Sequence, residues 1–408
     1  MEICSWDQAR ERAAAFTRRL EPLLATPDEA VGGVLGEPLR ALADMPPYDT
    51  ATVDGWAVSG PGPWRVRAAT RRDMFAGMDY HEASNHTLLR DGQAAPVTAG
   101  EPLGAGVTGV VHQNRSRVDG TLLKLLQTNR YRSSEPAQFA GSNYIEPGAG
   151  VRARGSDAGA GSMLLPEGEP VTPAVAALAA LAGHDALSIL PMPIIGLIRV
   201  GDDVLDRGIA RAGLTRDGVT PALPGWIAGI RGRCQPTRIV TEGDGELIDV
   251  IDDVISDVVI TSGPSADAAV RRVLSGMRAD ILVDGVDCQP GSHMLLAQLQ
   301  DGRPLIHCGG MPADALATLL TLAAPIICAL TGLPDPAQVG RMDEPVIGDR
   351  RRTLLMPVVS TSPRNNGVSL ARPGGPSGLF ALARASGLVV IPPEGRRTNE
   401  SVTVLPMP

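Results

Sequence analysis

Between residues 194 and 331, short apolar segments alternate with stretches of helical spacing. The segments expected to be strands are IIGLIRV, TRIVTE, DVVITSG, ADILVDGV and PLIHCGG. The stretches expected to be helices lie at about 222–232, 245–256, 266–277 and 313–330. Apolar strands that alternate with helices are typical of a parallel sheet covered on both faces. We therefore expect an α/β domain, to which we assign residues 181–335.

The rest of the chain is expected to form further domains, because a single core stops growing at roughly 250 to 300 residues and this chain has 408. Residues 46–144 hold short β-like runs, namely GWAVSG, WRVRAAT and TGVVHQN, and predict a β-rich module. Residues 336–408 predict a small β-rich domain with strands in RRTLLMPVVS, GVSLARP and GLVVIPPEG and a short helix in SGLFALARASG. The expected fold class is α/β and multidomain.

A fourth, helical and linking domain is expected from residues 1–45 together with residues 145–180. Residues 1–45 predict two helices, the second ending near Asp44 because Pro46 and Pro47 cannot continue it.

A further helix is expected from about Thr172 to Ala182. Thr172 suits the N-cap, Pro173 suits the first helical position and Gly183 can end the helix.

Composition restricts the possible partners and the compartment. The net charge is −8 and Lys124 is the only lysine, so no surplus of cations is present to neutralise a nucleic acid. The longest apolar stretch that we identify, residues 174–190, is interrupted and too short to cross a bilayer. Five widely spaced cysteines form no CxxC pair, which favours a reducing, cytoplasmic location.

Polar residues follow several of the expected strands, where open parallel sheets bind ligands. Asp202 and Asp203 follow the first strand in VGDDVL, and Thr261, Ser262 and Gly263 open a helix after a later one. The turns DCQPGSH and HCGGMPADAL follow two more strands. A free helix N-terminus can hold an anion, so these turns together predict a phosphate or oxyanion cleft. Each turn alone also fits an ordinary helix cap.

An Asp-Gly pair lies in the apolar run PPYDTATVDGWAVSG, residues 46–60. Asp54 and Gly55 fit a plain β-turn. They also fit a turn that presents a carboxylate to a ligand.

Motifs along the whole chain resemble those of the MoeA family of molybdopterin molybdenumtransferases, which includes the E domain of gephyrin. ATVDGWAVSG is similar to SAMDGYAV, GVRARGSDAGAGSMLLPEG to NIRRRGEDIRAGEVLLPAG, and VGDDVL to TGDEL. DVVITSGPS is similar to DVVISSGGVS, QPGSH to KPGKP, and GGMPADAL to GLPGNPVS. VTAGEPLGAGVTGVVHQN and GPSGLFALARASGLVVIPPEG also have counterparts in the same order.

The resemblance implies an L-shaped homodimer in which the α/β domain binds the pterin and the module carrying Asp54 completes the site of its partner. It implies that adenylylated molybdopterin (molybdopterin-AMP) and molybdate bind in the cleft and that molybdenum is inserted with release of AMP. The implied cofactor is Mg²⁺, which prefers carboxylate oxygens.

By the same resemblance, the residues expected in the site fall into three groups. The polar catalytic groups are Asp54, Asp157, Asp202 and Asp203. The residues expected to face the metal are Asp202, Asp203 and Glu242. Those expected to line the pterin and phosphate pocket are Thr98, Thr261, Ser262, Gly263, Pro290, Gly291, Ser292, Gly310, Pro312 and Asp314.

Several positions depart from the family pattern. Gln289 and Ser292 replace both lysines of KPGKP, and Val175 stands where a glutamate is expected. Pro264 replaces a glycine, and Asp267 stands in place of an acidic pair. Glu242 and Gly243 replace two aspartates. Ala313, Asp314 and Ala315 stand in place of GNP, and Thr98, Ala99 and Gly100 in place of TGA.

These changes remove cations and carboxylates from an anion site, each lost charge-assisted bond being worth about 1.5 to 3 kcal/mol. Arg152, Arg154 and Arg303 are candidates to replace the lost cations. The sequence is therefore consistent with two functions. One is the molybdenum insertase. The other is a catalytically impaired relative that acts as a dimeric scaffold or regulator for other cofactor-synthesis proteins or a peptide.

Overall fold

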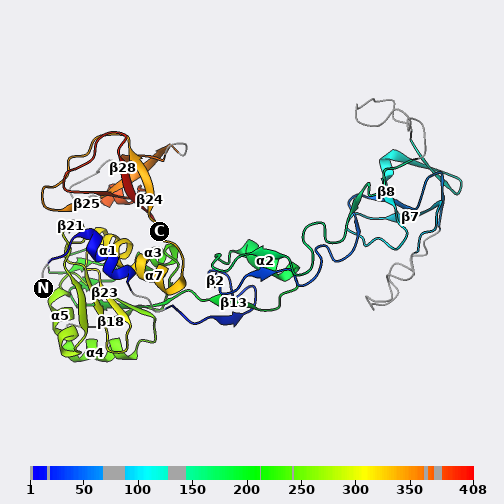
Figure 1. Cartoon of the computed structure of the whole chain (residues 1–408). Coiled ribbons are helices and arrows are strands. Elements are labelled where there is room, and N and C mark those ends of the chain that lie inside the picture. Colours follow the sequence, from blue (N-terminus) through cyan, green and yellow to red (C-terminus); the bar gives the residue numbers. More distant parts are fainter. Residues whose placement is uncertain are drawn as a thin grey trace. The chain divides into compact units, whose positions relative to one another are not determined.

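The computed structural model describes residues 3–15, 19–67, 88–126, 144–211, 213–240, 243–362, 366–371 and 379–408 (Figure 1). The chain forms two compact units. The α/β unit consists of Met1–Leu24, Gly32–Gly36 and Ser188–Pro408. The β-module unit consists of Ala25–Val31 and Glu37–Leu187. The division into four domains drawn from the sequence stays a prediction.

The centre of the α/β unit is a seven-stranded sheet in the order β17-β14-β19-β23-β22-β20, with β18 also paired to β14. Its strands are β14 (Ile194–Val200), β17 (Arg233–Cys234), β18 (Arg238–Val240), β19 (Val258–Ser262), β20 (Asp280–Asp284), β22 (Leu295–Gln298) and β23 (Pro304–His307). Strands β17, β18, β14, β19 and β23 are parallel, as the sequence predicted. Strands β22 and β20 extend the sheet in antiparallel pairing, because a short turn joins β22 directly to β23.

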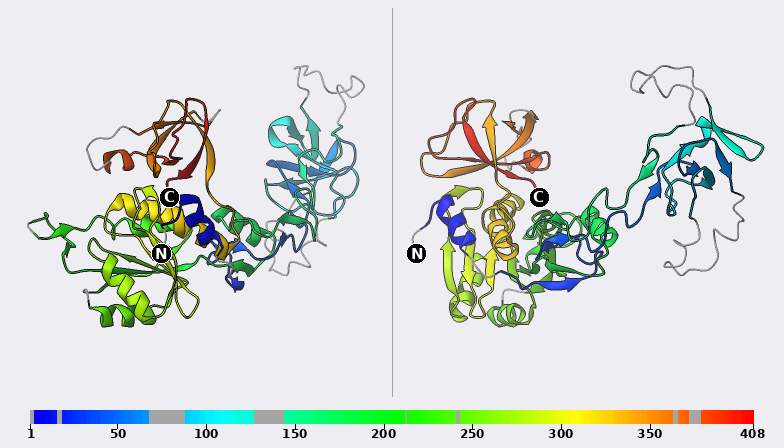
Figure 2. Two further views of the ribbon diagram at one scale, coloured as in Figure 1. Left: turned by 60° about the vertical axis from the view of Figure 1, so that its left-hand side comes forward. Right: turned by 45° about the vertical axis from the view of Figure 1, so that its right-hand side comes forward.

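Helices cover both faces of this sheet, as the apolar strands predicted (Figure 1 and Figure 2). They are α1 (Trp6–Ala14), α3 (Leu223–Gly229), α4 (Asp244–Asp253), α5 (Asp267–Gly276), α6 (Pro312–Thr318) and α7 (Ala324–Thr331). In β14, Ile195 and Leu197 belong to the core with α1, α3, α6 and α7. Ile198 and Val200 belong to the core with α4 and α5. This alternation follows from the two-residue period of a strand.

One continuous helical run fills the core beside the sheet. Helix α6, the π-helical turn η4 (Leu319–Ala323) and α7 together span Pro312–Thr331. This run of 20 residues is apolar and long enough to cross a membrane, but 78% of its most apolar window is buried. It is longer than the interrupted apolar stretch at residues 174–190. Burial on this scale is that of a core helix.

The C-terminal residues form a second sheet, in the order β21-β25-β26-β24-β28-β27. Its strands are β21 (Cys288–Gln289), β24 (Gln338–Met342), β25 (Thr353–Ser362), β26 (Gly367–Leu370), β27 (Gly387–Ile391) and β28 (Ser401–Pro406), with the short helix α8 (Leu379–Leu382). The three predicted strands and the short helix are confirmed. Strand β21, paired to β25, and the buried Leu355, Leu388 and Leu405 attach this sheet to the α/β core.

The β-module unit contains a six-stranded sheet in the order β8-β5-β7-β6-β10-β9. Its strands are β5 (Gly55–Val58), β6 (Trp64–Val66), β7 (Gln93–Val97), β8 (Gly109–His112), β9 (Ser116–Asp119) and β10 (Leu122–Leu125), with the 3₁₀ turn η2 (Gln113–Arg115). The runs GWAVSG and TGVVHQN form strands as predicted, and so does the described part of WRVRAAT. Val58, Trp64 and Leu123 form the centre of its core.

Helix α2 (Pro173–Leu181) forms as the sequence predicted. The Thr172 hydroxyl accepts the N–H of Val175, and Pro173 takes the first position. Gly183 follows with φ +98°, a conformation that favours glycine. The same unit contains two strand pairs, β3 (Leu39–Arg40) with β12 (Met163–Leu165) and β4 (Thr50–Ala51) with β11 (Val151–Arg152).

The prediction of two helices in residues 1–45 is half wrong. Helix α1 forms, but the described residues 19–45 contain no second helix. The strands there are β1 (Leu23–Ala25), β2 (Val34–Leu35) and β3, and later in the chain β13 (Leu187–Leu190) pairs with β2. Gly32 has φ +93°, and a Cβ on it would lie 2.8 Å from the Met192 sulfur. This segment turns where a helix would have to continue.

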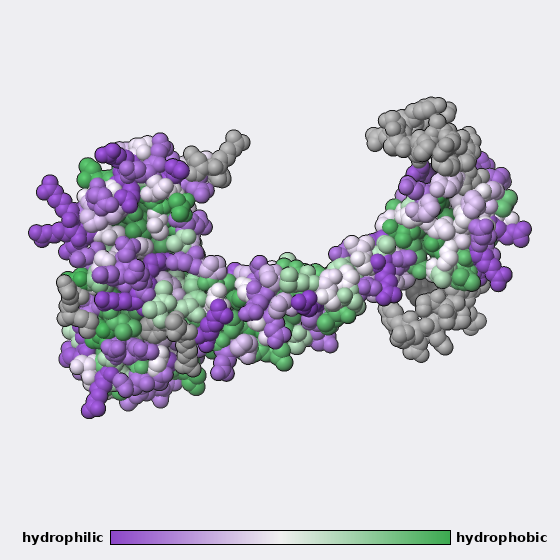
Figure 3. Space-filling view, in the orientation of Figure 1, coloured by the Kyte–Doolittle hydropathy of each residue, from purple (hydrophilic) through white to green (hydrophobic). Residues whose placement is uncertain are grey.

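Apolar side chains are exposed around α2. Leu42, Met163 and Leu181 are 60%, 57% and 77% exposed, and Figure 3 shows apolar surface over this part of the chain. The Leu42 N–H donates to the carbonyl of Ala182, so Leu42 and Leu181 lie on adjoining segments. Contiguous exposed apolar surface marks a contact site more often than chance.

Candidate functional site

The carboxyl ends of three parallel strands meet at one edge of the α/β sheet. Arg199 of β14 pairs with Ser262 of β19, and Thr261 of β19 pairs with His307 of β23. The turns that follow these strands therefore lie side by side. They are the turns VGDDVL, TSGPSADA and HCGGMPADAL of the sequence.

The turns after β19 and β23 are packed too tightly for a side chain at one position each. A Cβ on Gly263 would lie 2.1 Å from the carbonyl oxygen of Val200. A Cβ on Gly310 would lie 2.3 Å from the Cα of Pro264. The N–H of Gly263 donates to the carbonyl of Gly309 at 3.2 Å. Glycine is thus required here for close approach of two backbones.

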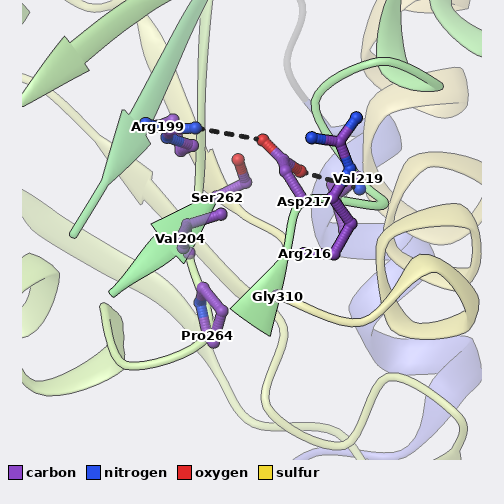
Figure 4. Close-up of a pocket in the computed structure, with 9 residues that line it drawn as sticks. Arg199, Val204, Arg216, Asp217, Val219, Ser262, Pro264 and Gly310 are labelled. Carbon is purple, nitrogen blue, oxygen red and sulfur yellow. Dashed lines mark hydrogen bonds and ion pairs between the residues drawn. The ribbon is translucent and has the colours of Figure 1, made fainter. Parts of the chain in front are cut away.

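A small open cavity lies at this edge (Figure 4). Its lining comes from β14, β19, the segments that follow them and the turn after β23. The lining residues are Arg199, Val204, Arg216, Asp217, Val219, Ser262, Gly263, Pro264 and Gly310. Of the residues expected in the pocket, Ser262, Gly263 and Gly310 are among them.

Arg199 is a buried cation in this cavity. It is 5% exposed, forms an ion pair with Asp206 and lies 3.4 Å from an Asp217 oxygen. Its Nε is buried without a hydrogen-bond partner among the described residues. The sequence reading missed Arg199, although a lone charge inside the apolar strand IIGLIRV was a usable signal.

Asp217 also lines the cavity. Its Oδ1 accepts the N–H groups of Val219 and Thr220, both at 3.0 Å. Burial raises the pKa of Asp217, but hydrogen bonds from Thr220 and Val219 and the contact with Arg199 lower it by more, so the pKa lies below its ordinary value. Asp217 was also missed from the sequence, since it follows a short irregular segment and not a strong strand.

The two carboxylates predicted after β14 have different surroundings. Asp202 is exposed. Oδ2 of Asp203 accepts the hydroxyl of Ser265 at 3.0 Å, while its Oδ1 is buried without a partner among the described residues. Glu242, the third expected metal ligand, lies outside the described residues. No cluster of three or more His, Cys, Asp and Glu side chains suited to a metal occurs in the described ranges.

A second polar cluster lies on the other face of the same strand ends. His307 is fully buried, with Nδ1 2.9 Å from the Thr261 hydroxyl and Nε2 2.7 Å from Oδ1 of Asp267. The hydrogen bond from His307 holds the pKa of Asp267 below its ordinary value, despite partial burial. Nδ1 of His293 lies 3.8 Å from the second Asp267 oxygen. Thr261 was expected to line the pocket, but its side chain points to this face and is fully buried.

The expected residues of the turns 290–292 and 312–314 lie together. Asp314, in the first turn of α6, accepts the N–H of Gly291 at 2.7 Å. Pro312 opens that helix, and Pro290 and Ser292 flank Gly291 and are partly buried. These two turns are therefore joined by one carboxylate.

Asp54 and Thr98 lie together in the β-module unit. Oδ1 of Asp54 accepts the N–H of Ala99 at 2.8 Å, and the N–H of Thr98 donates to the Glu101 carboxylate, also at 2.8 Å. Both residues are exposed. The Asp54 carboxylate thus braces a turn and keeps its other oxygen available.

The remaining predicted groups are held in ion pairs. Asp157 pairs with Arg152, and Arg154 pairs with Asp44, in the β-module unit. Arg303 pairs with Asp301 and donates to the carbonyls of Ile251 and Val254 beside α4. Arg303 precedes β23, so it lies at the end of the strand opposite to the cavity. The cations that line the described cavity are Arg199 and Arg216, neither of which was among the three candidates.

The fold defines a multidomain α/β protein with a cavity at the strand ends of its parallel sheet. The MoeA N-terminal region (domain I and II) matches residues 4–183. Molybdopterin molybdenumtransferase 1 of Mycobacterium tuberculosis is 28% identical, over 97% of both chains. Molybdopterin molybdenumtransferase 2 of the same organism is 26% identical, over 81% of this chain and 80% of its own.

The molybdopterin biosynthesis MoeA protein of Pyrococcus horikosii has the same fold, with a TM-score of 0.71 and 21% identity over the whole of both chains. In sequence and in fold the chain is thus similar to proteins of the MoeA family.

Proposed function

We propose that this protein acts in molybdenum cofactor biosynthesis and inserts molybdenum from molybdate into adenylylated molybdopterin, with release of AMP. The relatives named molybdopterin molybdenumtransferase match it along most of its length. The observation that carries the proposal is the strand-end cavity, in which Ser262, Gly263 and the buried Arg199 face one another. An oxyanion requires donors and positive charge of this kind.

The phosphate groups are assigned to the turn that opens α5. Ser262 supplies a hydroxyl, and the free N–H groups at the start of this ten-residue helix favour an anion. The neighbouring turns carry the pterin, with Pro290, Gly291, Ser292, Gly310, Pro312 and Asp314 as its lining. Thr261 supports this turn from the opposite face.

Asp202 and Asp203 suit a magnesium ion. The Asp203 oxygen without a partner is a group that a cation would satisfy, and Mg²⁺ commonly uses one or two carboxylates together with substrate phosphates. Glu242 is proposed as a further ligand. The ion would neutralise charge on the phosphates when bound.

A homodimer is proposed, in which the β-module unit of one copy contributes Asp54, Thr98 and Asp157 to the site of its partner. The exposed Leu42, Met163 and Leu181 supply apolar surface that a second copy would cover. Five free cysteines suit the cytoplasm.

A second function is proposed because several candidate site residues already interact with other side chains or backbone groups of the same chain. Asp157 and Arg199 are held in ion pairs, and Asp54 braces a turn. Together with the two lost lysines, these contacts favour a dimeric scaffold or regulator that binds a peptide or other cofactor-synthesis proteins.

Calorimetry separates the two functions. With adenylylated molybdopterin as titrant, the insertase should show micromolar binding that S262A weakens. S369A, which removes a hydroxyl from the distant C-terminal sheet, should leave binding unchanged. The insertase should also restore growth of a strain that lacks its own molybdenum insertase. A soluble dimer that neither binds nor complements would leave only the scaffold.

A further inference from the structure

His307 connects three elements at the site although it is fully buried. It ends β23, its Nδ1 faces Thr261 at the end of β19, and its Nε2 faces Asp267 at the start of α5. A buried polar ring must have its hydrogen bonds satisfied. Both ring nitrogens meet this requirement through side chains from other elements.

The two partners of His307 stand at the two ends of one turn. Thr261 immediately precedes Ser262, and Asp267 immediately follows Ala266. The five residues between them form the turn assigned to the phosphates. With Nε2–H donating to the Asp267 carboxylate, Nδ1 accepts the hydroxyl proton of Thr261. One side chain therefore fixes both ends of the turn.

Backbone contacts also hold the Thr261 end of the turn, since the carbonyl of Thr261 accepts the N–H of Cys308 at 3.0 Å. Gly263 donates to Gly309, and the Ser265 hydroxyl donates to Asp203. Asp267 itself is partly exposed, and besides His307 it faces His293 and Arg271. Without His307, the start of α5 would keep only these more exposed contacts.

We propose that His307 is a positioning residue that clamps the turn of residues 262–266 through Thr261 and Asp267, and so sets the affinity of that turn for a phosphate-containing ligand. The ligand part of this proposal rests on the proposed function. His307 does not touch the ligand, because it lies on the opposite face of the strands from Ser262 and the cavity.

Three substitutions at His307 separate its two hydrogen bonds. H307Q places an amide near the position of Nε2 and can keep the bond to Asp267, whereas H307N places one near Nδ1 and can keep the bond to Thr261. H307F keeps the ring shape and loses both bonds. We expect H307F to weaken the binding of inorganic pyrophosphate, measured by calorimetry, by about tenfold.

H307Q should recover most of that loss and H307N little of it, because Asp267 is the charged partner and anchors the helix. D267N should weaken binding as H307F does, and the double variant should be no weaker than either single one. If H307F, H307Q, H307N and D267N all bound pyrophosphate with equal affinity, the proposal would be overturned.

A matched control separates positioning from general stability. T331V removes the hydroxyl of another buried threonine, which donates only to the carbonyl of Ile327 in α7. T331V should lower the melting temperature and leave pyrophosphate affinity unchanged. If T331V weakened binding as much as H307F, affinity would follow stability alone and the clamp would be disproved.

Hydrogen exchange tests the clamp without any ligand. H307F and D267N should raise exchange at the amides of residues 262–267, and T331V should not. If the wild type bound no pyrophosphate, the proposed function would fail while the exchange result would still decide the clamp. Unchanged exchange in H307F would overturn the clamp itself.

Discussion

Gly310 lies so close to Pro264 that a Cβ on Gly310 would be 2.3 Å from the Cα of Pro264. This contact joins the turn after β23 to the turn after β19 through backbone atoms, which cannot move aside as a flexible side chain can. We predict that G310A forces the two turns apart and destabilises the protein by about 1–3 kcal/mol. Chemical denaturation of the full chain measures the change.

Gly276 provides the control for G310A. It ends α5, and a Cβ on it would find no atom within 4 Å. G276A should therefore be neutral or stabilise by up to about 1 kcal/mol. Equal losses in G310A and G276A would mean that the close approach has no energetic consequence.

The ion pair of Arg199 and Asp217 predicts unequal effects of removing its two members. D217N leaves a buried guanidinium with only the more exposed Asp206, and should cost about 1–3 kcal/mol of stability. R199M leaves the buried Asp217 carboxylate without its cation, so its cost should be larger, about 3–5 kcal/mol. Urea unfolding of the two variants measures this difference.

D244N is the matched control for D217N, since Asp244 and Arg272 form a pair that is about half exposed. Its effect should be below about 1 kcal/mol. A D217N protein as stable as D244N would contradict the buried role of Asp217.

The sequence predicted those features that depend on local spacing. The apolar runs at 194–200 and 257–263 form parallel strands, and the cap formed by Thr172, Pro173 and Gly183 marks both ends of α2. Each of these signals lies within a few residues of the element it specifies. The second helix expected before Asp44 failed because glycine turns override a weak periodicity.

The site was predicted less completely, because its contacts join residues far apart in the chain. Ser262, Gly263 and Gly310 line the cavity as expected. Arg199 and His307 were missed, although each is a polar residue at the end of an apolar strand. Because side chains alternate between the two faces of the sheet, Arg199 faces the cavity and His307 faces the other side. The face on which each lies follows from the strand register, which the sequence alone does not give.

Four buried or partly buried cysteines predict a slow reaction with thiol reagents. Burial raises the pKa of Cys288 and of Cys308 to about 12, and that of Cys234 and of Cys328 to about 11. Because the thiolate is the reactive form, we expect these four thiols to react with an aromatic disulfide reagent at pH 8 far more slowly in the folded protein than in guanidinium. Rapid native labelling at Cys308 would contradict its burial.

The Asp267 carboxylate predicts a specific loss of stability in acid. The hydrogen bond from His307 lowers the pKa of Asp267 in the folded protein below the value of about 4 found in unfolded chains. The unfolded state therefore binds the proton first, so this contribution is fully present above about pH 4 and fades as the pH falls through the lower, folded value.

D267N removes that contribution, so its stability should fall less steeply than that of the wild type between about pH 5 and pH 3. Urea unfolding at half-unit steps of pH measures both curves. D252N, which removes an exposed carboxyl group of α4 outside this cluster, gives the general effect of one lost charge. If D267N and D252N changed the acid slope equally, the bond between His307 and Asp267 would contribute nothing to the folded state.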